Sequence, residues 1–385
     1  MSKDYFTPAE FAERQRRVRE VMRRKNLDLL LVISPIHINY LTGAAAKAYQ
    51  VFQCLFFTLE DKPPTLLLRM SDVAEMMDHS LAGEVRGWGG RRYEDPIDAF
   101  AGVMAEKGWL RVRIGLEMPA YYLSVHNYLK MRDVLREATV QDETALVENL
   151  KLVKSPAELA YVRKAAAVAD AGLVAIEKTL ALGATEREVA AEAHRAMMAA
   201  GGDSPPSPMN FVSGERTCYA HGMPSDRALS AGDFMHIEFG GQYRRYCSTV
   251  ARHYAMGEPS ARARQLHDVT HRASQACIAM MKAGVRAEDV HKTAVGVIRE
   301  AGLERYNLHT TGYGIAPGFP PSWGESINLF DKSESILEAG MVLSIEPPVF
   351  IREEGLGARL IDCVIVHEDR AEVLSGYPAD LVIVA

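Results

Sequence analysis

The 385-residue chain contains few cysteines, and no two of them stand close together. The five are Cys54, Cys218, Cys247, Cys277 and Cys363. An odd number without a Cys-x-x-Cys pair excludes a disulfide framework and a zinc site made of thiolates. A reducing, cytoplasmic location is therefore expected.

Long hydrophobic runs are also absent. The longest apolar stretch, residues 27–33, is interrupted by Asp28. It is far shorter than the ~20 residues that a helix needs to cross a membrane. The first residues contain no apolar segment of the kind that signal peptides have. We therefore expect neither a membrane-spanning segment nor a membrane partner.

Basic residues are not in excess. The chain has 44 Lys and Arg residues against 50 Asp and Glu residues, which gives a net charge of −6. Nucleic-acid binders usually carry a basic excess or a basic stripe, so no nucleic-acid partner is expected. The 48% hydrophobic and 24% charged residues are typical of a globular protein.

Two helix-start signals divide the chain. Thr7-Pro8-Ala9-Glu10 and Ser155-Pro156-Ala157-Glu158 each combine an N-cap hydroxyl, a proline and a glutamate. The first predicts a helix to about residue 25, and the second predicts an alanine-rich helix to about residue 182. Between them the pattern predicts a helix at 96–107 and strands at 27–33, 51–58, 65–69 and 112–117. We expect an α/β domain over 1–150 and a second domain over 151–385.

The second domain begins with long helices and continues with strand-like segments at 234–239, 341–345 and 362–367. It also contains two similar segments, because residues 183–189 match residues 284–290 at an offset of about 101 positions. Each copy is predicted to be a long helix, a glycine turn and a second helix. A duplication would give two similar halves around a pseudo-two-fold axis, with a cleft between them. A chance likeness of two alanine-rich helices is the alternative.

Six motifs of the second domain occur in a characteristic order, at 152–158, 213–227, 232–240, 311–315, 340–348 and 357–362. They resemble the creatinase/aminopeptidase superfamily, and Leu29–Val32 with Asn39–Gly43 resembles its N-terminal domain. The superfamily includes Xaa-Pro peptidases, methionine aminopeptidases and creatinase. The resemblance implies an α+β protein. Its C-terminal pita-bread domain has pseudo-two-fold symmetry and follows a smaller α/β domain of the creatinase type.

The same resemblance places a metal-ligand set on this chain, and most of that set is missing. Peptidases of the superfamily hold two metal ions with an Asp, Asp, His, Glu and Glu set. The matching positions here are Glu238, Thr249, Tyr313, Glu346 and Ile361. Two carboxylates without a histidine do not readily hold two ions that activate water. The resemblance therefore implies a metal-free member that uses no cofactor.

Metal-free members of the superfamily, creatinase and the ectoine hydrolases, cleave C–N bonds in small polar molecules. We therefore predict a metal-independent hydrolase of a non-peptide C–N bond in a small zwitterionic compound. Ectoine-like cyclic amidines and guanidino or ureido acids are the expected substrates. Creatine itself is disfavoured, because Ala251 and Ile361 replace two groups on which creatinase relies. A metal-dependent Xaa-Pro dipeptidase and an inactive binding module are the alternatives.

Four residues are predicted to carry catalysis. His221 would move a proton between the attacking water and the leaving nitrogen. Glu238 and Glu346 would bind the nitrogen-rich group, or one of them would act as the base. Tyr313 would donate a hydrogen bond to a developing oxyanion. The structural alternatives are a surface imidazole, salt-bridged carboxylates and a phenol that fills vacated space.

Three further residues are predicted to bind the substrate. Trp323 and Glu325 lie in a Pro/Gly-rich loop and would hold a cationic group. Arg69 ends a hydrophobic strand and would bind a substrate carboxylate. In the superfamily's small-molecule members the N-terminal domain reaches over the partner subunit's site, so the resemblance implies a homodimer with Arg69 at that position. Packing at a dimer interface and a solvated strand end are the alternatives.

Overall fold

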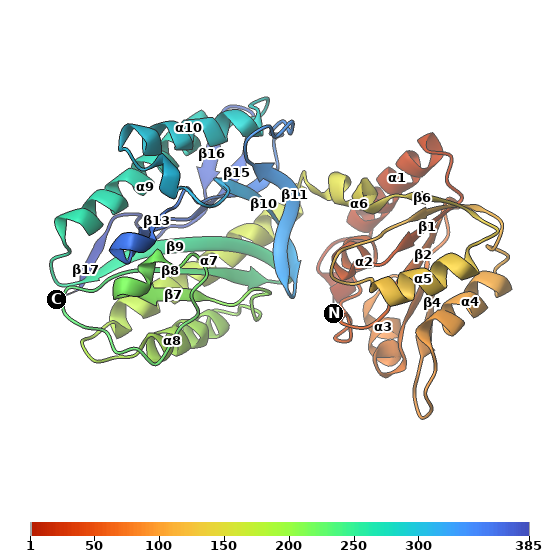
Figure 1. Ribbon diagram of the computed structural model, residues 1–385. Helices are drawn as coiled ribbons and strands as arrows, with labels where there is room; N and C mark the ends of the chain where they lie inside the picture. The colour runs from red at the N-terminus through yellow and green to blue at the C-terminus, as the bar shows by residue number, and fades with distance from the viewer. Residues whose placement is uncertain (1, 385) are drawn as a thin grey trace. The chain divides into compact units, whose positions relative to one another are not determined.

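The computed structural model describes residues 2–384 of the chain. The chain divides into two compact units, Met1–Lys151 and Leu152–Ala385, and each has its own sheet (Figure 1). Each also has its own hydrophobic core.

The first unit is built on a six-stranded sheet in the order β4-β3-β2-β1-β5-β6. Strand β2 runs antiparallel to both of its neighbours, and the other pairs are parallel. The strands are β1 Leu29–Val32, β2 Cys54–Thr58, β3 Thr65–Arg69, β4 Glu84–Trp88, β5 Arg113–Leu116 and β6 Thr139–Asp142. The helices are α1 Pro8–Arg24, α2 Pro35–Thr42, α3 Val73–His79, α4 Pro96–Glu106, α5 Val125–Val134 and α6 Thr144–Lys151.

The central strand β1 explains the unbroken apolar run in the sequence. Leu30 and Val32 join the core cluster on one face of the sheet, and Leu29 and Leu31 join the cluster on the other face. A strand that is covered on both faces needs apolar residues at every position. The order of helices and strands matches the predicted α/β domain.

The second unit is built on a nine-stranded sheet. Its main path is β16-β15-β12-β10-β9-β8-β7, with β11 paired to β10 and β17 paired to β9. The helices are α7 Pro156–Thr179, α8 Glu186–Ala199, α9 Ala261–Met280 and α10 Ala287–Glu300. The strands are β7 Asn210–Ser213, β8 Phe234–Tyr243, β9 Tyr246–Met256, β10 Gly312–Phe319, β11 Ser322–Leu329, β12 Val342–Ile345, β13 Val349–Ile351, β14 Leu356–Ala358, β15 Asp362–Val366, β16 Ala371–Val373 and β17 Val382–Val384.

The two similar segments, residues 183–189 and 284–290, have similar local structure. Helices α8 and α10 have 14 residues each, and each follows a glycine with positive φ, Gly183 (φ 82°) and Gly284 (φ 86°). Helices α7 and α8 share one core cluster with β8 and β9. Helices α9 and α10 share the other with β11, β12 and β15. The predicted α+β fold, with a pita-bread domain after a smaller α/β domain, is confirmed.

Helix α7 approaches β8 closely enough to demand a glycine. A Cβ built on Gly241 would lie 2.1 Å from the backbone oxygen of Ala165.

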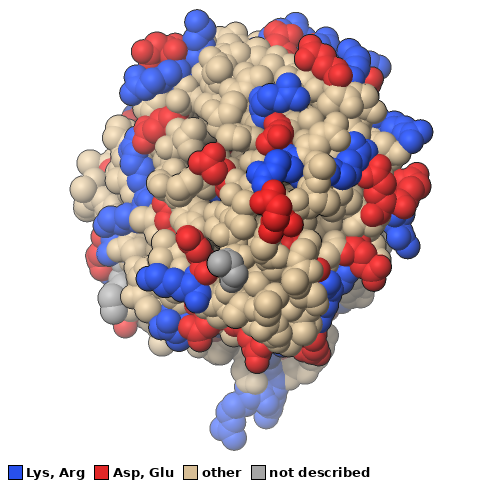
Figure 2. Space-filling model, turned by 90° about the vertical axis from the view of Figure 1, so that its left-hand side faces the viewer, with Lys and Arg blue, Asp and Glu red and all other residues tan. Residues whose placement is uncertain are grey.

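The second unit presents acidic and basic side chains interspersed over the face that Figure 2 shows. Across residues 2–384, none of the helices is both long and apolar enough to cross a membrane.

One local prediction is wrong. Residues 319–325 were expected to form a loop, but they form the tip of a hairpin between β10 and β11. In β11 the side chains of Trp323, Glu325, Ile327 and Leu329 are buried and alternate with less buried neighbours. This period-2 pattern is the strand signal that the Pro and Gly residues hid.

Candidate active site

A buried carboxylate organises the segment that carries His221. Glu186, at the start of α8, is fully buried and accepts hydrogen bonds from both ends of residues 213–225. At one end the donors are Ser213 N (3.0 Å) and Oγ (2.6 Å). At the other they are Ser225 N (2.9 Å) and Oγ (2.6 Å). The segment that carries His221 is therefore anchored at both of its ends.

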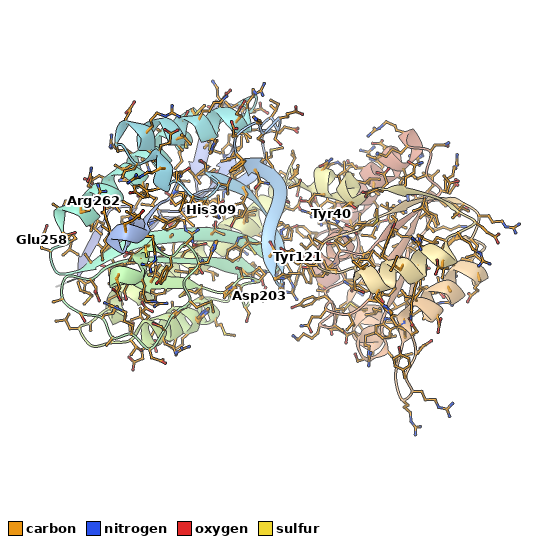
Figure 3. All side chains as sticks on the ribbon, viewed as in Figure 1. Tyr40, Tyr121, Asp203, Glu258, Arg262 and His309 are labelled. Atoms are coloured by element: carbon orange, nitrogen blue, oxygen red, sulfur yellow. The ribbon has the colours of Figure 1, made fainter. Side chains whose placement is uncertain are left out.

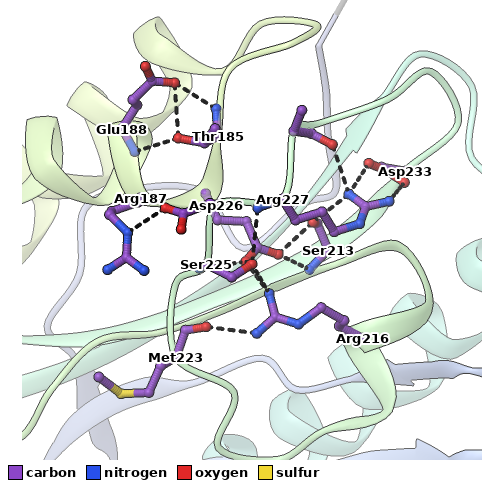
Figure 4. Close-up of polar contacts among 12 residues, drawn as sticks. Thr185, Arg187, Glu188, Ser213, Arg216, Met223, Ser225, Asp226, Arg227 and Asp233 are labelled. Atoms are coloured by element: carbon purple, nitrogen blue, oxygen red, sulfur yellow. Dashed lines mark hydrogen bonds and ion pairs between the residues drawn. The ribbon is translucent and has the colours of Figure 1, made fainter.

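Two arginines extend this anchor. Arg216 pairs with Glu186 and donates to Ser225 Oγ (2.8 Å) and to Met223 O (2.8 Å), as Figure 4 shows in part. Arg227 forms two hydrogen bonds with Asp233, at 2.5 and 2.7 Å. Glu186 and its partners thus convert a loop of irregular backbone into a fixed support.

His221 lies beside a second histidine, His309, which Figure 3 labels. The two ring centroids are 5.7 Å apart in an edge-to-face arrangement. Desolvation, and then the positive charges of Arg359 and His309, lower the pKa of His221 below its usual value of 6.5. At neutral pH the His221 imidazole is therefore neutral and can accept a proton.

Glu346 follows β12 and is 1% exposed. Burial raises the pKa of its carboxyl group to about 8, and a hydrogen bond of 3.4 Å from Ser344 Oγ opposes part of that shift. Its Oε1 lies 4.0 Å from Nδ1 of His309. At pH 7 Glu346 is mostly protonated and can donate a proton.

Tyr313 occupies β10 beside Glu346. Its backbone N–H donates to Ser344 Oγ (3.2 Å), and its hydroxyl accepts a hydrogen bond from Trp323 Nε1 (3.2 Å). Burial and then the charge of Glu346 raise the pKa of the phenol, so Tyr313 stays protonated. Its O–H can therefore serve as a hydrogen-bond donor.

Glu238 lies on β8 and is held from two sides. Its Oε2 pairs with Arg359 Nη2 and accepts a hydrogen bond of 3.1 Å from Asn210 Nδ2. The same Arg359 nitrogen donates to the backbone oxygen of Ala220 at 2.5 Å, directly before His221. The carboxylate of Glu238 is thus already neutralised by a side chain of the protein.

Of the three predicted substrate-binding residues, Trp323 contacts this group, because its Nε1 donates to the Tyr313 hydroxyl. Trp323 is 5% exposed, and a Cβ on Gly240 would lie 2.8 Å from its indole ring. Glu325 forms a buried ion pair with Lys154. Arg69 belongs to the first unit, where its guanidinium lies 4.8 Å above the ring of Trp88. Their roles in binding a substrate stay predictions.

The residues at the metal-ligand positions do not fit a pair of metal ions. Thr249 and Tyr313 are poor ligands, and the Ile361 side chain has no donor atom. Glu238 is engaged by Arg359. Among residues 2–384, no group of three or more His, Cys, Asp and Glu side chains is arranged to hold a metal ion.

The sequence interpretation missed three residues of this site. His309 stands two residues before Thr311-Gly312-Tyr313, and a histidine so close to a recognised motif was the available signal. Arg359 lay inside a recognised motif, but no role was assigned to it. Glu186 gave no signal beyond its place in a helix start, because its partners are 27 to 39 residues away.

Comparison with known proteins identifies the family that each unit matches. Residues 160–368 match the metallopeptidase family M24, and residues 14–153 match the creatinase/prolidase N-terminal domain. A probable dipeptidase PepE of Mycobacterium bovis is 32% identical over 361 residues, which cover 92% of each chain. A Xaa-Pro dipeptidase of Pyrococcus furiosus is 29% identical over 262 residues, which cover 68% of this chain and 73% of the relative.

A solved structure agrees with these relatives. The Xaa-Pro dipeptidase from Bacillus anthracis superposes with a TM-score of 0.85 at 26% identity, and the match covers 97% of this chain and 100% of that one. The predicted cleavage of a non-peptide C–N bond in an ectoine-like, guanidino or ureido compound is therefore wrong, because the matching proteins are dipeptidases.

Proposed function

Because the chain belongs to the metallopeptidase family M24, we propose that it hydrolyses short peptides of the Xaa-Pro dipeptide class. We further propose that its own side chains move the protons, in place of a pair of metal ions. The peptide substrate is supported by the Xaa-Pro dipeptidases that the chain resembles over most of its length. The side-chain chemistry is supported by a donor set that does not fit metal ions.

The main observation behind this proposal is that His309 lies next to both His221 and Glu346. The rings of His221 and His309 are 5.7 Å apart, and His309 Nδ1 lies 4.0 Å from Glu346 Oε1. The pKa of His221 is lowered, whereas burial raises the pKa of Glu346 to about 8. Two neighbouring groups whose pKa values are pushed apart are suited to act as base and acid in one reaction.

The roles follow from the protonation states. Between the pKa of His221 and about pH 8, His221 is neutral and Glu346 carries a proton. His221 takes a proton from the attacking water, whose oxygen forms a bond to the carbonyl carbon. Glu346 gives its proton to the leaving nitrogen as the C–N bond breaks. His309, between the two, returns the proton from His221 to Glu346 for the next turnover.

The experiment is an assay of proline release from a panel of Xaa-Pro dipeptides, with products identified by mass spectrometry. Each reaction is run with excess EDTA, and again with Mn²⁺ or Co²⁺. We expect release that EDTA does not diminish and that Glu346→Gln lowers by more than ~10²-fold. The exposed Glu334→Gln, in the same unit, is the matched control and should match the wild type.

The outcomes separate the two parts of the proposal. Proline release that requires added metal would contradict the side-chain mechanism and leave the peptidase function standing. An absence of release under every condition would contradict the peptidase function itself. Binding of the dipeptides without cleavage would instead identify a peptide-binding domain.

A further inference from the structure

Arg359 is a buried guanidinium with unused donors. Its side chain is 1% exposed. Of its three nitrogens, only Nη2 is engaged, with Glu238 and with Ala220 O. Nε is buried without a hydrogen-bond partner, and Nη1 has none among residues 2–384. A guanidinium has five N–H groups, so three remain free here.

Arg252 of the same unit shows what a structural arginine looks like. It is equally buried and pairs with Asp362. Its Nη1 donates to two backbone oxygens, of Ala251 (2.9 Å) and Ile361 (2.8 Å). Its Nη2 donates to Asp362 (2.8 Å) and to Tyr377 O (3.0 Å), so only Nε lacks a partner. Arg359 differs from Arg252 in the empty Nη1.

Buried polar groups in native proteins are nearly always hydrogen-bonded, because an unpaired one costs about 1–3 kcal/mol. Unlike Nε, the unpartnered Nη1 is not fully buried, so a ligand atom can reach it. The vacant donors belong to a cation, so the matching ligand atom is an acceptor that carries negative charge.

We propose that Arg359 is the oxyanion-binding residue of this site, where it offers its free guanidinium N–H groups to the substrate's carbonyl oxygen. The centre thus accepts an anionic oxygen instead of a metal cation. The contact with Ala220 O places the guanidinium directly beside the segment that carries His221. Glu238, which is itself held by a hydrogen bond from Asn210, pairs with Nη2 and fixes the guanidinium.

The inference rests on the proposed hydrolysis and names the group that stabilises its intermediate. As the water oxygen bonds to the carbonyl carbon, the carbonyl π electrons move to the oxygen. That oxygen becomes negative and accepts hydrogen bonds from Arg359. When the intermediate collapses, the electrons return to the C–O bond and the C–N bond breaks. Preorganised donors that act on charge which develops during reaction stabilise the transition state more than the substrate.

The test uses a phosphinic pseudo-dipeptide, whose tetrahedral anionic phosphorus group replaces the scissile amide. Its binding to the full-length protein is measured by isothermal titration calorimetry in buffer with excess EDTA. The variant is Arg359→Met with Glu238→Gln, which removes the charge pair without leaving a carboxylate unpaired. The matched control, Arg252→Met with Asp362→Asn, removes the other buried pair of the same unit. Circular dichroism checks that both double variants fold. If the Arg359 variant does not fold, Arg359→Lys takes its place, because lysine keeps the charge and loses the planar fork.

We expect the wild type to bind the phosphinate more tightly than the parent dipeptide. The Arg359 variant should lose about 10- to 100-fold in affinity, the value of a charge-assisted hydrogen bond. The Arg252 control should stay within about 3-fold of the wild type. Equal affinity in the Arg359 variant, or wild-type binding only after metal is added, would overturn the inference.

The inference and the proposed function fail in different ways. Binding of the phosphinate that depends on Arg359, in a protein that cleaves no dipeptide, would support the anion site and contradict the peptidase function. Cleavage of dipeptides that survives the loss of Arg359 would contradict the anion site alone.

Discussion

A buried pair of histidines makes the second unit sensitive to mild acid. His253 on β9 is fully buried, and its Nδ1 lies 2.9 Å from Nδ1 of His267 on α9. Burial lowers the pKa of His253 well below 6.5, and the positive charges of His267, His236 and Arg252 lower it further. Folding therefore keeps this imidazole neutral at pH values where the unfolded chain protonates it.

The sign and size of the effect follow from proton linkage. Between the lowered pKa of the folded state and 6.5, the unfolded state binds one more proton, so stability falls as the pH falls. The full contribution is present above pH 6.5. Below it the slope approaches 1.36 kcal/mol per pH unit. From pH 8 to pH 5, His253 alone should lower the free energy of unfolding by about 2 kcal/mol.

The perturbation is His253→Asn, which keeps a short polar group near the position of Nδ1 and cannot titrate. The smaller side chain lowers the free energy of unfolding by an amount that does not depend on pH. Urea unfolding between pH 5 and 8 is followed by the fluorescence of Trp323, in a background with Trp88→Phe and Trp109→Phe. Trp323 is then the one tryptophan that remains, because the chain has three.

The difference between the wild type and His253→Asn should shrink by about 2 kcal/mol as the pH falls from 8 to 5. His367→Asn is the control, because this half-buried histidine lies at the surface of the same unit and pairs with Glu372. It should keep the acid sensitivity of the wild type. If His253→Asn lost as much stability as the wild type over this range, the neutral buried histidine would not be its cause.

Three further predictions concern the site and the assembly. The pH profile of kcat/KM should fall above about pH 8, where Glu346 loses its proton, and Glu346→Gln should abolish that limb together with most of the activity. Glu186→Gln should destabilise the second unit by about 3 kcal/mol and speed hydrogen exchange in residues 213–225, since it weakens a buried ion pair; unchanged exchange there would refute its anchoring role. Light scattering should give the mass of a homodimer, and Arg69→Ala should raise KM if Arg69 reaches the partner's site; a monomeric mass would exclude that arrangement.

Local signals predicted most of the helices and strands. The capping residues at Ser155 predicted the start of α7, where both hydrogen bonds of the capping box are present. The apolar run at 27–33 predicted β1, and the strands expected at 51–58 and 65–69 correspond to β2 and β3. These signals act over a few residues, so they can be recognised without the fold. The hairpin at 319–325 was missed because its turn residues suggested a loop.

The site was predicted only in part. Motif order and spacing pointed to His221, Glu238, Tyr313 and Glu346, because these residues stand inside recognisable segments, and their roles stay predictions. Trp323 and Glu325 were expected in a loop, whereas they lie in strand β11. The substrate class was wrong, because missing metal ligands indicate how a site works and not which bond it cleaves.

The sequence by itself determined the order of the elements and which residues stand at the metal-ligand positions that the resemblance implies. A ligand set is lost through residue identity, and Ile361 has no donor atom in any fold. Only the tertiary structure decided that Glu238 pairs with Arg359, 121 residues away, and that Glu346 holds its proton to about pH 8. Ion pairing and desolvation depend on the distance between groups and on their burial, and neither exists until the chain has folded.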